Sequence, residues 1–268
     1  MIEIRSSSWG DLLDCAARWS AIHIEKIYRP SSVPAMMGTA IHYGTAIYDS
    51  AKVEQRTPSI EEAVEAAHQK VRQPDEEIKW MADDYSRRQA EEITIKATEL
   101  YCREVSPLYE YSAVELRPVP LDIDVDGQII RITGQMDRTR IIKDPLYENG
   151  EGITDVKTGK RIVDSQGKVS TKGFKFQLGV YEILTEHSYG RKVTLPAQIA
   201  AVSTAKQPKA GTAAVYDAKA LMLGTPEEPG IIETAGRMVK AGLFPPNPYS
   251  RLCSEKFCPI YHRCKAHD

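Results

Sequence analysis

The sequence predicts an α/β or α+β fold in which a central mixed sheet is flanked by helices. Two observations lead to this fold class. Helical patterns dominate up to about Val105, whereas residues from Val114 onward alternate apolar and polar side chains as strands do, before a further helix and strand. A chain of 268 residues can bury an adequate core, and we expect residues 1–268 to form a single domain.

Helices are expected in the first part of the chain. Ser6–Ser8 with Asp11 form a helix-start signal, because a serine hydroxyl caps free backbone amides and an aspartate suits the positive end of a helix. The expected segments are one helix that carries Trp9 through Trp19, a second over Gly38–Val53, and a helical stretch over about 55–110 with a break at Pro74.

Strands are expected in the middle of the chain. An alternation over Val114–Val125 ends at an Asp126-Gly127 hairpin turn and resumes over Ile129–Ile142. With a short strand over Ile153–Lys157, this region predicts a three-stranded meander. The remaining expected elements are a helix over Phe174–Glu186, a strand over Ala197–Ser203, and a helix over Ile231–Ala241 that is ended by Gly242 and the Pro245-Pro246 pair.

The strand over Ile153–Lys157 carries the first candidate chemistry. Residues two apart on a strand point to the same side, so Asp155 and Lys157 are expected to project together. A carboxylate there suits a divalent metal that polarises a phosphate and lowers the pKa of a bound water. The lysine suits stabilisation of the attacking hydroxide or of transition-state charge. Alone, the Asp-x-Lys pattern is weak evidence for a catalytic site. An exposed strand with an ion pair that contributes little to stability has the same sequence pattern.

Other polar residues stand in a defined order around this pair. His42 ends the segment Gly38-Thr39-Ala40-Ile41-His42, and Asp137 ends Gly134-Gln135-Met136-Asp137, where the glycine lets the chain bend. Gln177 and Tyr181 are four residues apart and share one helix face. Each of these patterns is common by chance, but all four in sequence are not.

In that order, the chain resembles the RecB-like branch of the PD-(D/E)XK nucleases. That branch has a helix with a small-residue-His motif, then Gly-x-x-Asp, Asp/Glu-x-Lys and Gln-x-x-x-Tyr. The resemblance implies a restriction-endonuclease-like core that binds Mg²⁺ or Mn²⁺. It also implies these roles: His42, Asp137 and Asp155 as metal ligands with the Val156 carbonyl as a further one, Lys157 as the catalytic lysine, and Gln177 and Tyr181 as residues that contact DNA or brace the site. Glu115, on the first strand, is a further acidic candidate.

The cysteines are unevenly placed. Cys253, Cys258 and Cys264 lie within the last sixteen residues, and Cys15 lies near the start. Clustered cysteines in a reducing cytoplasm indicate metal ligands rather than disulfides. The pattern leaves two alternatives: a Zn²⁺ site completed by His262 or His267, and a four-thiolate [4Fe–4S] cluster that uses Cys15. The fifth, Cys102, is expected in a helix core.

The iron–sulfur subgroup of these nucleases, which includes the CRISPR-associated RecB-like exonucleases, places one cysteine before the nuclease core and three after it. The chain is similar, and the resemblance implies a structural [4Fe–4S] cluster on Cys15, Cys253, Cys258 and Cys264. Two departures keep Zn²⁺ as the alternative. Ala16 follows Cys15 where a proline is frequent in the subgroup, and the interval from Cys253 to Cys258 is longer than usual.

A formal net charge of −2 argues against a protein that coats nucleic acid through bulk charge. Local positive charge is still available on Lys160, Lys172 and Lys175, which we assign to DNA binding, although a lysine-rich segment is more often a solvated loop. The apolar runs are too short to cross a bilayer and no secretory signal is visible, so we expect a cytoplasmic protein without a membrane partner.

Together these features predict a metal-dependent DNA exonuclease that acts on single-stranded DNA or DNA ends. The helical stretch near 55–110 is expected to cap the active site. The resemblance implies work in recombination, repair, phage replication or CRISPR adaptation, beside a recombination, helicase or adaptation partner. The alternatives are a structure-specific or nicking endonuclease, a DNA-binding adaptor subunit with a vestigial nuclease site, and a zinc-stapled interaction module.

Overall fold

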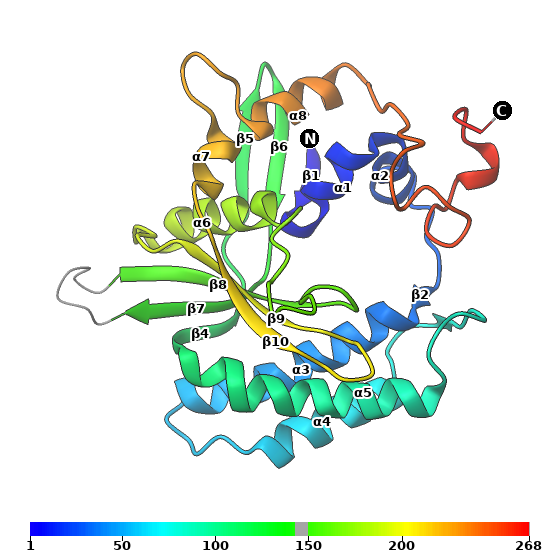
Figure 1. The fold of residues 1–268 in the computed structure, drawn as a ribbon. Coiled ribbons are helices and arrows are strands. Elements are labelled where there is room, and N and C mark those ends of the chain that lie inside the picture. The colour runs from blue at the N-terminus through cyan, green and yellow to red at the C-terminus, as the bar shows by residue number, and fades with distance from the viewer. Residues whose placement is uncertain (143–149, 268) are drawn as a thin grey trace.

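In the computed structural model of the protein, residues 1–142 and 150–267 are described. Figure 1 shows a central five-stranded sheet with long helices packed on one side of it and a second, smaller sheet beyond the helices of the other side. None of the helices within the described residues is long and apolar enough to cross a membrane.

The central sheet is mixed, as predicted. Its strand order is β10-β9-β8-β7-β4, in which β8 and β9 are parallel and the other neighbours are antiparallel. The strands are β4 (Glu110–Leu116), β7 (Met136–Ile142), β8 (Gly150–Thr158), β9 (Ala197–Val202) and β10 (Ala210–Val215). Residues Gly150 to Val156 of β8 are all buried, which is expected of a strand with neighbours on both edges and helices on both faces.

Three long helices cover one face of this sheet (Figure 1). They are α3 (Val33–Val53), α4 (Ile60–Arg72) and α5 (Arg87–Leu100), and a turn of π-helix over Tyr101–Val105 extends α5. Ile41 of α3 and Tyr101 pack with Val156 of β8 in one core cluster, which joins the helices to the sheet. The predicted break near Pro74 is confirmed, because α4 ends before it and α5 begins beyond it.

The opposite face is covered by α6 (Lys175–Tyr189), which packs against α7 (Ala218–Leu223). Leu178 of α6 lies in a core cluster with Ile153 of β8 and Ile199 of β9. Ile153 and Val156 are three residues apart on β8 and therefore point to opposite faces: Ile153 packs with α6, and Val156 packs with α3.

The second sheet, in the order β1-β6-β5, packs with the terminal helices. Its strands are β1 (Ile2–Arg5), β5 (Leu121–Val125) and β6 (Gln128–Thr133), and the helices are α1 (Trp9–Asp14), α2 (Ala16–His23) and α8 (Ile231–Lys240). Trp9, Trp19 and Ile130 are completely buried in the core cluster that these elements share with α6. A two-stranded sheet of β2 (Ser31–Ser32) and β3 (Ile78–Lys79) completes the strands of the described residues.

Two sequence predictions are wrong in detail. The first helix is two helices, because Cys15 between them has extended backbone angles of φ −148° and ψ 94°. The region from Val114 to Ile142 is not a meander within one sheet. Pro118 and Pro120 lack the amide hydrogens needed to continue a strand, so β4 ends at Leu116 and the predicted hairpin of β5 and β6 joins the second sheet.

The segment that follows α8 passes beside the N-terminal helices α1 and α2 (Figure 1). Ala17 donates its backbone N–H to the carbonyl of Pro245 at 3.2 Å, and Asn247 Nδ2 donates to the carbonyl of Asp14 at 2.9 Å. The rings of Trp19 and Phe244 stack with their centroids 6.3 Å apart. The segment that precedes the three C-terminal cysteines is therefore packed directly on the helices that flank Cys15.

Candidate active site

Asp155 and Lys157 project to the same side of β8, as predicted. Lys157 Nζ lies 2.5 Å from Asp155 Oδ2, and the lysine also lies over the ring of Phe174, 5.1 Å from its centroid. Asp155 is completely buried. Among the described residues, the Lys157 ammonium is the one polar group in contact with its buried Oδ2.

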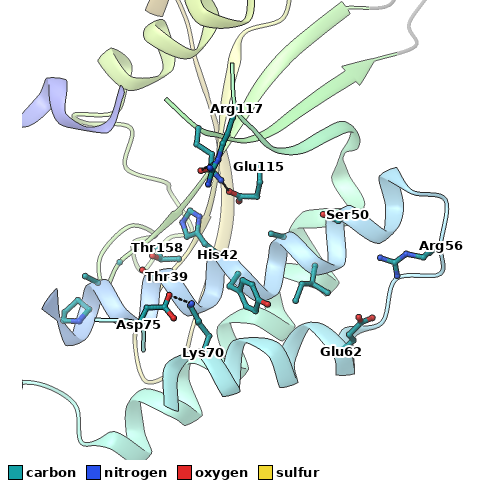
Figure 2. Close-up of a pocket in the computed structure, with 18 residues that line it drawn as sticks. Thr39, His42, Ser50, Arg56, Glu62, Lys70, Asp75, Glu115, Arg117 and Thr158 are labelled. Carbon is teal, nitrogen blue, oxygen red and sulfur yellow. Dashed lines mark hydrogen bonds and ion pairs between the residues drawn. The ribbon is translucent and has the colours of Figure 1, made fainter. Parts of the chain in front are cut away.

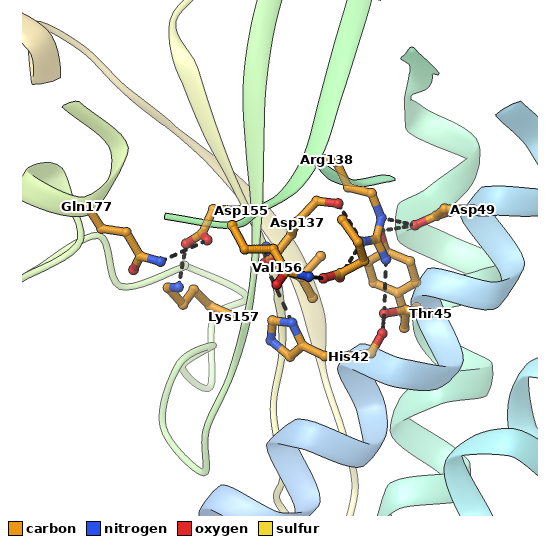
Figure 3. A network of polar contacts seen from close by, with 12 residues as sticks. His42, Thr45, Asp49, Asp137, Arg138, Asp155, Val156, Lys157 and Gln177 are labelled. Carbon is orange, nitrogen blue, oxygen red and sulfur yellow. Dashed lines mark hydrogen bonds and ion pairs between the residues drawn. The ribbon is translucent and has the colours of Figure 1, made fainter. Parts of the chain in front are cut away.

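Asp137 and His42 meet on the other side of β8, next to α3 (Figure 3). The regular pairing of β7 with β8 ends at Arg138 and Thr154, and beyond it the Asp137 carboxylate accepts the backbone N–H of Val156 at 2.8 Å. His42 Nδ1 lies 3.6 Å from the same Asp137 oxygen. The contact of Val156 with Asp137 uses its N–H, so a role for its carbonyl stays a prediction.

The surroundings shift the pKa values of the Asp155 and Asp137 carboxyl groups in opposite directions. Burial raises the pKa of Asp155 to about 6; Lys157 opposes this rise and the charge of Asp137 adds to it. Burial also works to raise the pKa of Asp137, but His42, Lys157 and Arg138 together hold that pKa well below the ordinary range. Asp137 is thus ionised at neutral pH, while Asp155 takes up a proton in mildly acidic solution.

The described residues hold no group of three or more His, Cys, Asp or Glu side chains arranged to bind a metal ion as they stand. The predicted ligands are therefore close but not gathered around one point. The Lys157 ammonium is in contact with the Asp155 carboxylate, and the His42 ring is in contact with the Asp137 carboxylate. Ion binding at these residues would replace those contacts.

Gln177 and Tyr181 lie on α6 and reach the active site from the other face of the sheet. Gln177 Nε2 lies 3.5 Å from Asp155 Oδ1 and donates to the Tyr181 hydroxyl at 2.7 Å, and Tyr181 donates to the carbonyl of Gln135 at 2.7 Å. The tyrosine is nearly buried, and this burial raises its pKa. The pair thus braces Asp155 against the segment that leads to Asp137.

Two glycines permit close approaches at the site. A Cβ on Gly38 would lie 2.7 Å from Thr158 Oγ1, so only glycine lets α3 come this near to the end of β8, one turn before His42. A Cβ on Gly134 would lie 2.9 Å from Ser6 Oγ and 3.0 Å from Tyr181. Both glycines of the motifs are therefore explained by packing, rather than by a bend in the chain.

A groove opens beside His42 and runs along α3 (Figure 2). Its volume is about 1180 Å³, and it lies between α3, α4 and the ends of β4 and β8. Glu115, which has a left-handed backbone with φ 52°, lines the groove and hydrogen bonds through Oε2 to Gln135 Nε2 at 2.5 Å. His42 and Glu115 both line this groove.

The predicted DNA-binding lysines lie on the segment between β8 and α6. Lys160 and Lys172 are exposed, and Lys175 is the first residue of α6. Lys160 Nζ lies over the ring of Tyr85, 5.4 Å from its centroid, so this segment touches the residues before α5. Their contact with DNA stays a prediction.

The four predicted cluster cysteines lie in one region. Burial raises the pKa of the Cys253 thiol, and charges on Cys258, Cys15 and Cys264 add to that shift because their sulfurs are near. Cys253 Sγ lies 3.1 Å from His267 Nε2. Within residues 1–142 and 150–267 no three of these side chains are assembled as a metal site. Cys102 is buried in the helical core, away from them, as predicted.

Sequence reasoning missed Arg138, Asp49 and Thr45. All three are completely buried, and Arg138 Nε donates to Asp49 Oδ2 at 2.7 Å (Figure 3). Asp49 stands seven residues after His42, on the same face of α3, and Arg138 directly follows Asp137. Charged residues at such inward-facing positions are a signal, but the sequence does not show that they pair.

Comparison with known proteins agrees with this arrangement. Residues 7–265 match the PD-(D/E)XK nuclease superfamily, and the chain belongs to that superfamily. Its mixed α/β fold, with a central mixed sheet flanked by helices, is consistent with the superfamily core. The protein is therefore a DNA nuclease, a hydrolase that acts on phosphodiester bonds.

Two solved structures align with the chain. The fold is similar to that of a candidate exonuclease from Eubacterium rectale, with a TM-score of 0.54 and 17% identity over 98% of this chain and 88% of that chain. The protein SSO0001 aligns with a TM-score of 0.33 and 18% identity over 58% of this chain and 60% of that chain, which is too weak a similarity to indicate a shared fold. No curated protein matches the chain.

Proposed function

We propose that the protein is a metal-dependent DNA exonuclease whose active site is built from His42, Asp137, Asp155 and Lys157. The observation that carries this proposal is the Asp155–Lys157 pair at 2.5 Å, in which the carboxylate is completely buried, next to the partly buried carboxylate of Asp137 on the neighbouring strand. A structural ion pair has no need of a second carboxylate and a histidine beside it. A metal-dependent site that hydrolyses phosphodiester bonds has a use for each of these groups, as metal ligands or as a cation beside the reacting phosphate.

The residues fit a divalent metal by their chemistry. Asp137 and Asp155 offer carboxylate oxygens, His42 offers a ring nitrogen, and within the described chain the buried Asp155 Oδ2 is in contact only with the Lys157 ammonium. Carboxylate oxygens suit Mg²⁺ and Mn²⁺, and a site with histidine favours Mn²⁺. A bound ion would polarise the scissile phosphate and lower the pKa of the attacking water.

Lys157 is proposed as the catalytic lysine. Its ammonium group sits beside the carboxylate that would hold the ion, so it can stabilise an attacking hydroxide and the charge that grows on the phosphate. Phe174 on its other side restricts its position. The lysine acts on the transition state and does not bind the ion.

Gln177 and Tyr181 are proposed to hold Asp155 in place or to contact DNA. Their hydrogen bonds to Asp155 and to the Gln135 carbonyl support the bracing role. Lys160, Lys172 and Lys175 are proposed to attract the DNA backbone, because they lie between the end of β8, which carries Asp155 and Lys157, and the first turn of α6. The proposed substrate is single-stranded DNA or a DNA end, in recombination, repair, phage replication or CRISPR adaptation.

The cysteines are proposed to hold a structural [4Fe–4S] cluster. The packing of the chain ends and the mutual nearness of Cys15, Cys253, Cys258 and Cys264 support four thiolate ligands. The contact of His267 with Cys253 favours the alternative, a Zn²⁺ site that uses this histidine. Iron and zinc analysis of the purified protein separates the two metals.

The exonuclease proposal is tested with end-labelled linear and covalently closed circular single-stranded DNA in the presence of Mn²⁺. Loss of the linear substrate alone, by the native protein and not by the Lys157→Ala variant, is expected. Cleavage of circles would make the protein an endonuclease. If neither linear nor circular single-stranded DNA is cut, double-stranded DNA is tested with a preparation that retains its cysteine-bound metal. If that DNA also stays intact, the DNA-binding adaptor subunit replaces this proposal.

A further inference from the structure

A buried polar network lies behind His42 and Asp137, on the side away from Asp155 (Figure 3). Its centre is the ion pair of Arg138 on β7 with Asp49 on α3, and both side chains are completely buried. A buried ion pair seldom stabilises a protein more than an apolar pair of the same volume. A contribution to folding stability therefore does not explain why Arg138 and Asp49 are charged. The other contacts of Arg138 indicate a different role.

The Arg138 guanidinium is linked to the main chain of two of the three proposed ligand residues, to Asp137 directly and to His42 through Thr45. Its Nη1 donates to the main-chain carbonyl of Asp137 at 2.7 Å. Its Nη2 donates to Thr45 Oγ1 at 3.3 Å, and Thr45 Oγ1 in turn donates to the main-chain carbonyl of His42 at 3.0 Å. Arg138 Nη1 also lies 3.3 Å from Glu115 Oε1. One side chain thus links the backbones of α3 and β7 at the active site.

This link stands where β7 loses one of its two neighbouring strands. Regular pairing of β7 with β8 ends at Arg138 and Thr154, so on this edge the main chain of Asp137 lies just beyond the ladder, while on the other edge Arg138 pairs with Val114 and Met136 with Leu116 of β4. The Asp137 carboxylate is held by the N–H of Val156, and its carbonyl is held by Arg138. Without Arg138, only one of these two restraints would remain.

Asp49 holds the Arg138 guanidinium in position and is itself held by two hydrogen bonds. Its Oδ2 accepts from the Tyr101 hydroxyl at 2.7 Å, and its Oδ1 accepts from Ser106 Oγ at 2.5 Å. Both donors lie in the segment that follows α5. The planar guanidinium of Arg138, with its fixed set of hydrogen-bond donors, therefore joins the helical layer to the central sheet at the active site.

We propose that Arg138 is a positioning residue of the active site, which sets the separation of His42 from Asp137 and the direction of Glu115. It touches neither substrate nor metal. The proposal rests on the proposed nuclease function of the same site. It predicts that a change at Arg138 weakens metal binding even when the protein remains folded.

The test compares Arg138→Lys with Arg140→Lys. Lysine at 138 keeps a positive charge for Asp49 but has one nitrogen, so it cannot also bind Thr45 and the Asp137 carbonyl. Arg140 is the matched control, because it is a second buried arginine of β7 whose Nη2 donates to the Pro196 carbonyl, away from the site. Mn²⁺ affinity is measured by calorimetry, together with the urea midpoint of each variant.

Arg138→Lys is expected to raise the Mn²⁺ dissociation constant about 10- to 100-fold, which is the usual effect of losing a group that orients metal ligands. Arg140→Lys is expected to bind Mn²⁺ as the native protein does. Equal affinity of Arg138→Lys and the native protein would overturn the proposal. So would an equal loss in both variants, because that would reflect a general loosening of β7.

Thr45→Val keeps the test decisive if Arg138→Lys does not fold. This change removes the hydroxyl between Arg138 and the His42 carbonyl and leaves the ion pair with Asp49 intact. A weaker Mn²⁺ affinity is expected, and an unchanged one overturns the proposal. Failure of the nuclease proposal is distinct, since the native protein would then show no Mn²⁺ binding and no cleavage that depends on Lys157.

Discussion

The carboxylate of Asp137 accepts the backbone N–H of Val156 at 2.8 Å, just beyond the point where β7 and β8 stop pairing. A side chain thereby takes the place of a main-chain partner between two central strands. The consequence is that a carboxylate is carried into the interior of the sheet, within reach of His42 on α3 and near Asp155 on β8. The local separation of two strands is what makes room for a site.

Metal binding should depend on pH through Asp155. Burial raises the pKa of this carboxyl to about 6, so its proton must leave before an ion can bind to it. Below about pH 6 the apparent Mn²⁺ affinity is expected to fall, by up to about tenfold for each pH unit, and above about pH 7 it should be level. Calorimetric titration at several pH values measures this. Affinity that stays constant from pH 5 to pH 8 would contradict the assignment of Asp155 as a ligand.

The buried ion pair predicts a large cost for removing one partner. Asp49→Ala leaves the Arg138 guanidinium buried without its counter-ion, and we expect the free energy of unfolding to fall by about 3 to 5 kcal/mol. Asp122→Ala is the matched control, because Asp122 forms an equally close pair with Arg131 at 2.7 Å on the surface. The urea midpoint of the control should barely move. Equal shifts in the two variants would contradict the picture of the network.

Glu182 on α6 predicts a pH-dependent stability. Burial raises its pKa from 4.5 to about 7, although the backbone N–H of Lys219 donates to its Oε2 at 3.0 Å. The folded state thus favours the protonated form, whose stabilising contribution is complete below pH 4.5 and is lost as the pH rises through about 7. Glu182→Gln mimics that form and should be more stable than the native protein by about 1 to 3 kcal/mol at pH 8.

The difference between the Glu182→Gln variant and the native protein is measured by urea unfolding at pH 4.5, 6 and 8. It should be smallest at the lowest pH and grow with each step. A constant difference, or one that grows in the acid direction, would show that Glu182 is charged in the folded protein.

The cysteine element predicts different effects for two buried cysteines. Cys15→Ala removes a proposed ligand at the junction of the chain ends, so the purified protein should lose iron and acid-labile sulfide and unfold at lower temperature. Cys102→Ala should keep its metal, because Cys102 lies in the helical core, where burial raises the pKa of the thiol to about 12, and not beside the other four cysteines. Zinc in place of iron would favour the Zn²⁺ site. Unchanged metal content in Cys15→Ala would exclude Cys15 as a ligand.

The sequence predicted what depends on local pattern. The Asp155–Lys157 pair follows from strand alternation, the Gln177–Tyr181 pair from helix spacing, and the hairpin of β5 and β6 from its Asp126-Gly127 turn. The division of the strands between two sheets was not predicted, because alternation shows that a strand exists and does not show its neighbours.

Other elements lacked a clear local signal. β10 is made of Ala, Gly, Thr and Val, a composition that alternation does not single out, and β1 and α7 are short. The Arg138–Asp49 network joins positions 89 residues apart, so no sequence period connects them. Contacts of this kind arise from tertiary packing alone, and they are where the structure adds most to the site.

The central claim is that Lys157 serves the transition state at a metal site formed by its neighbours. The most direct measurement is the cleavage rate of Lys157→Ala on end-labelled linear single-stranded DNA, together with Mn²⁺ affinity of the same preparation. We predict that the rate falls by at least about 100- to 1,000-fold while the affinity changes little. A variant that cleaves at nearly the native rate would show that the active site lies elsewhere in the protein.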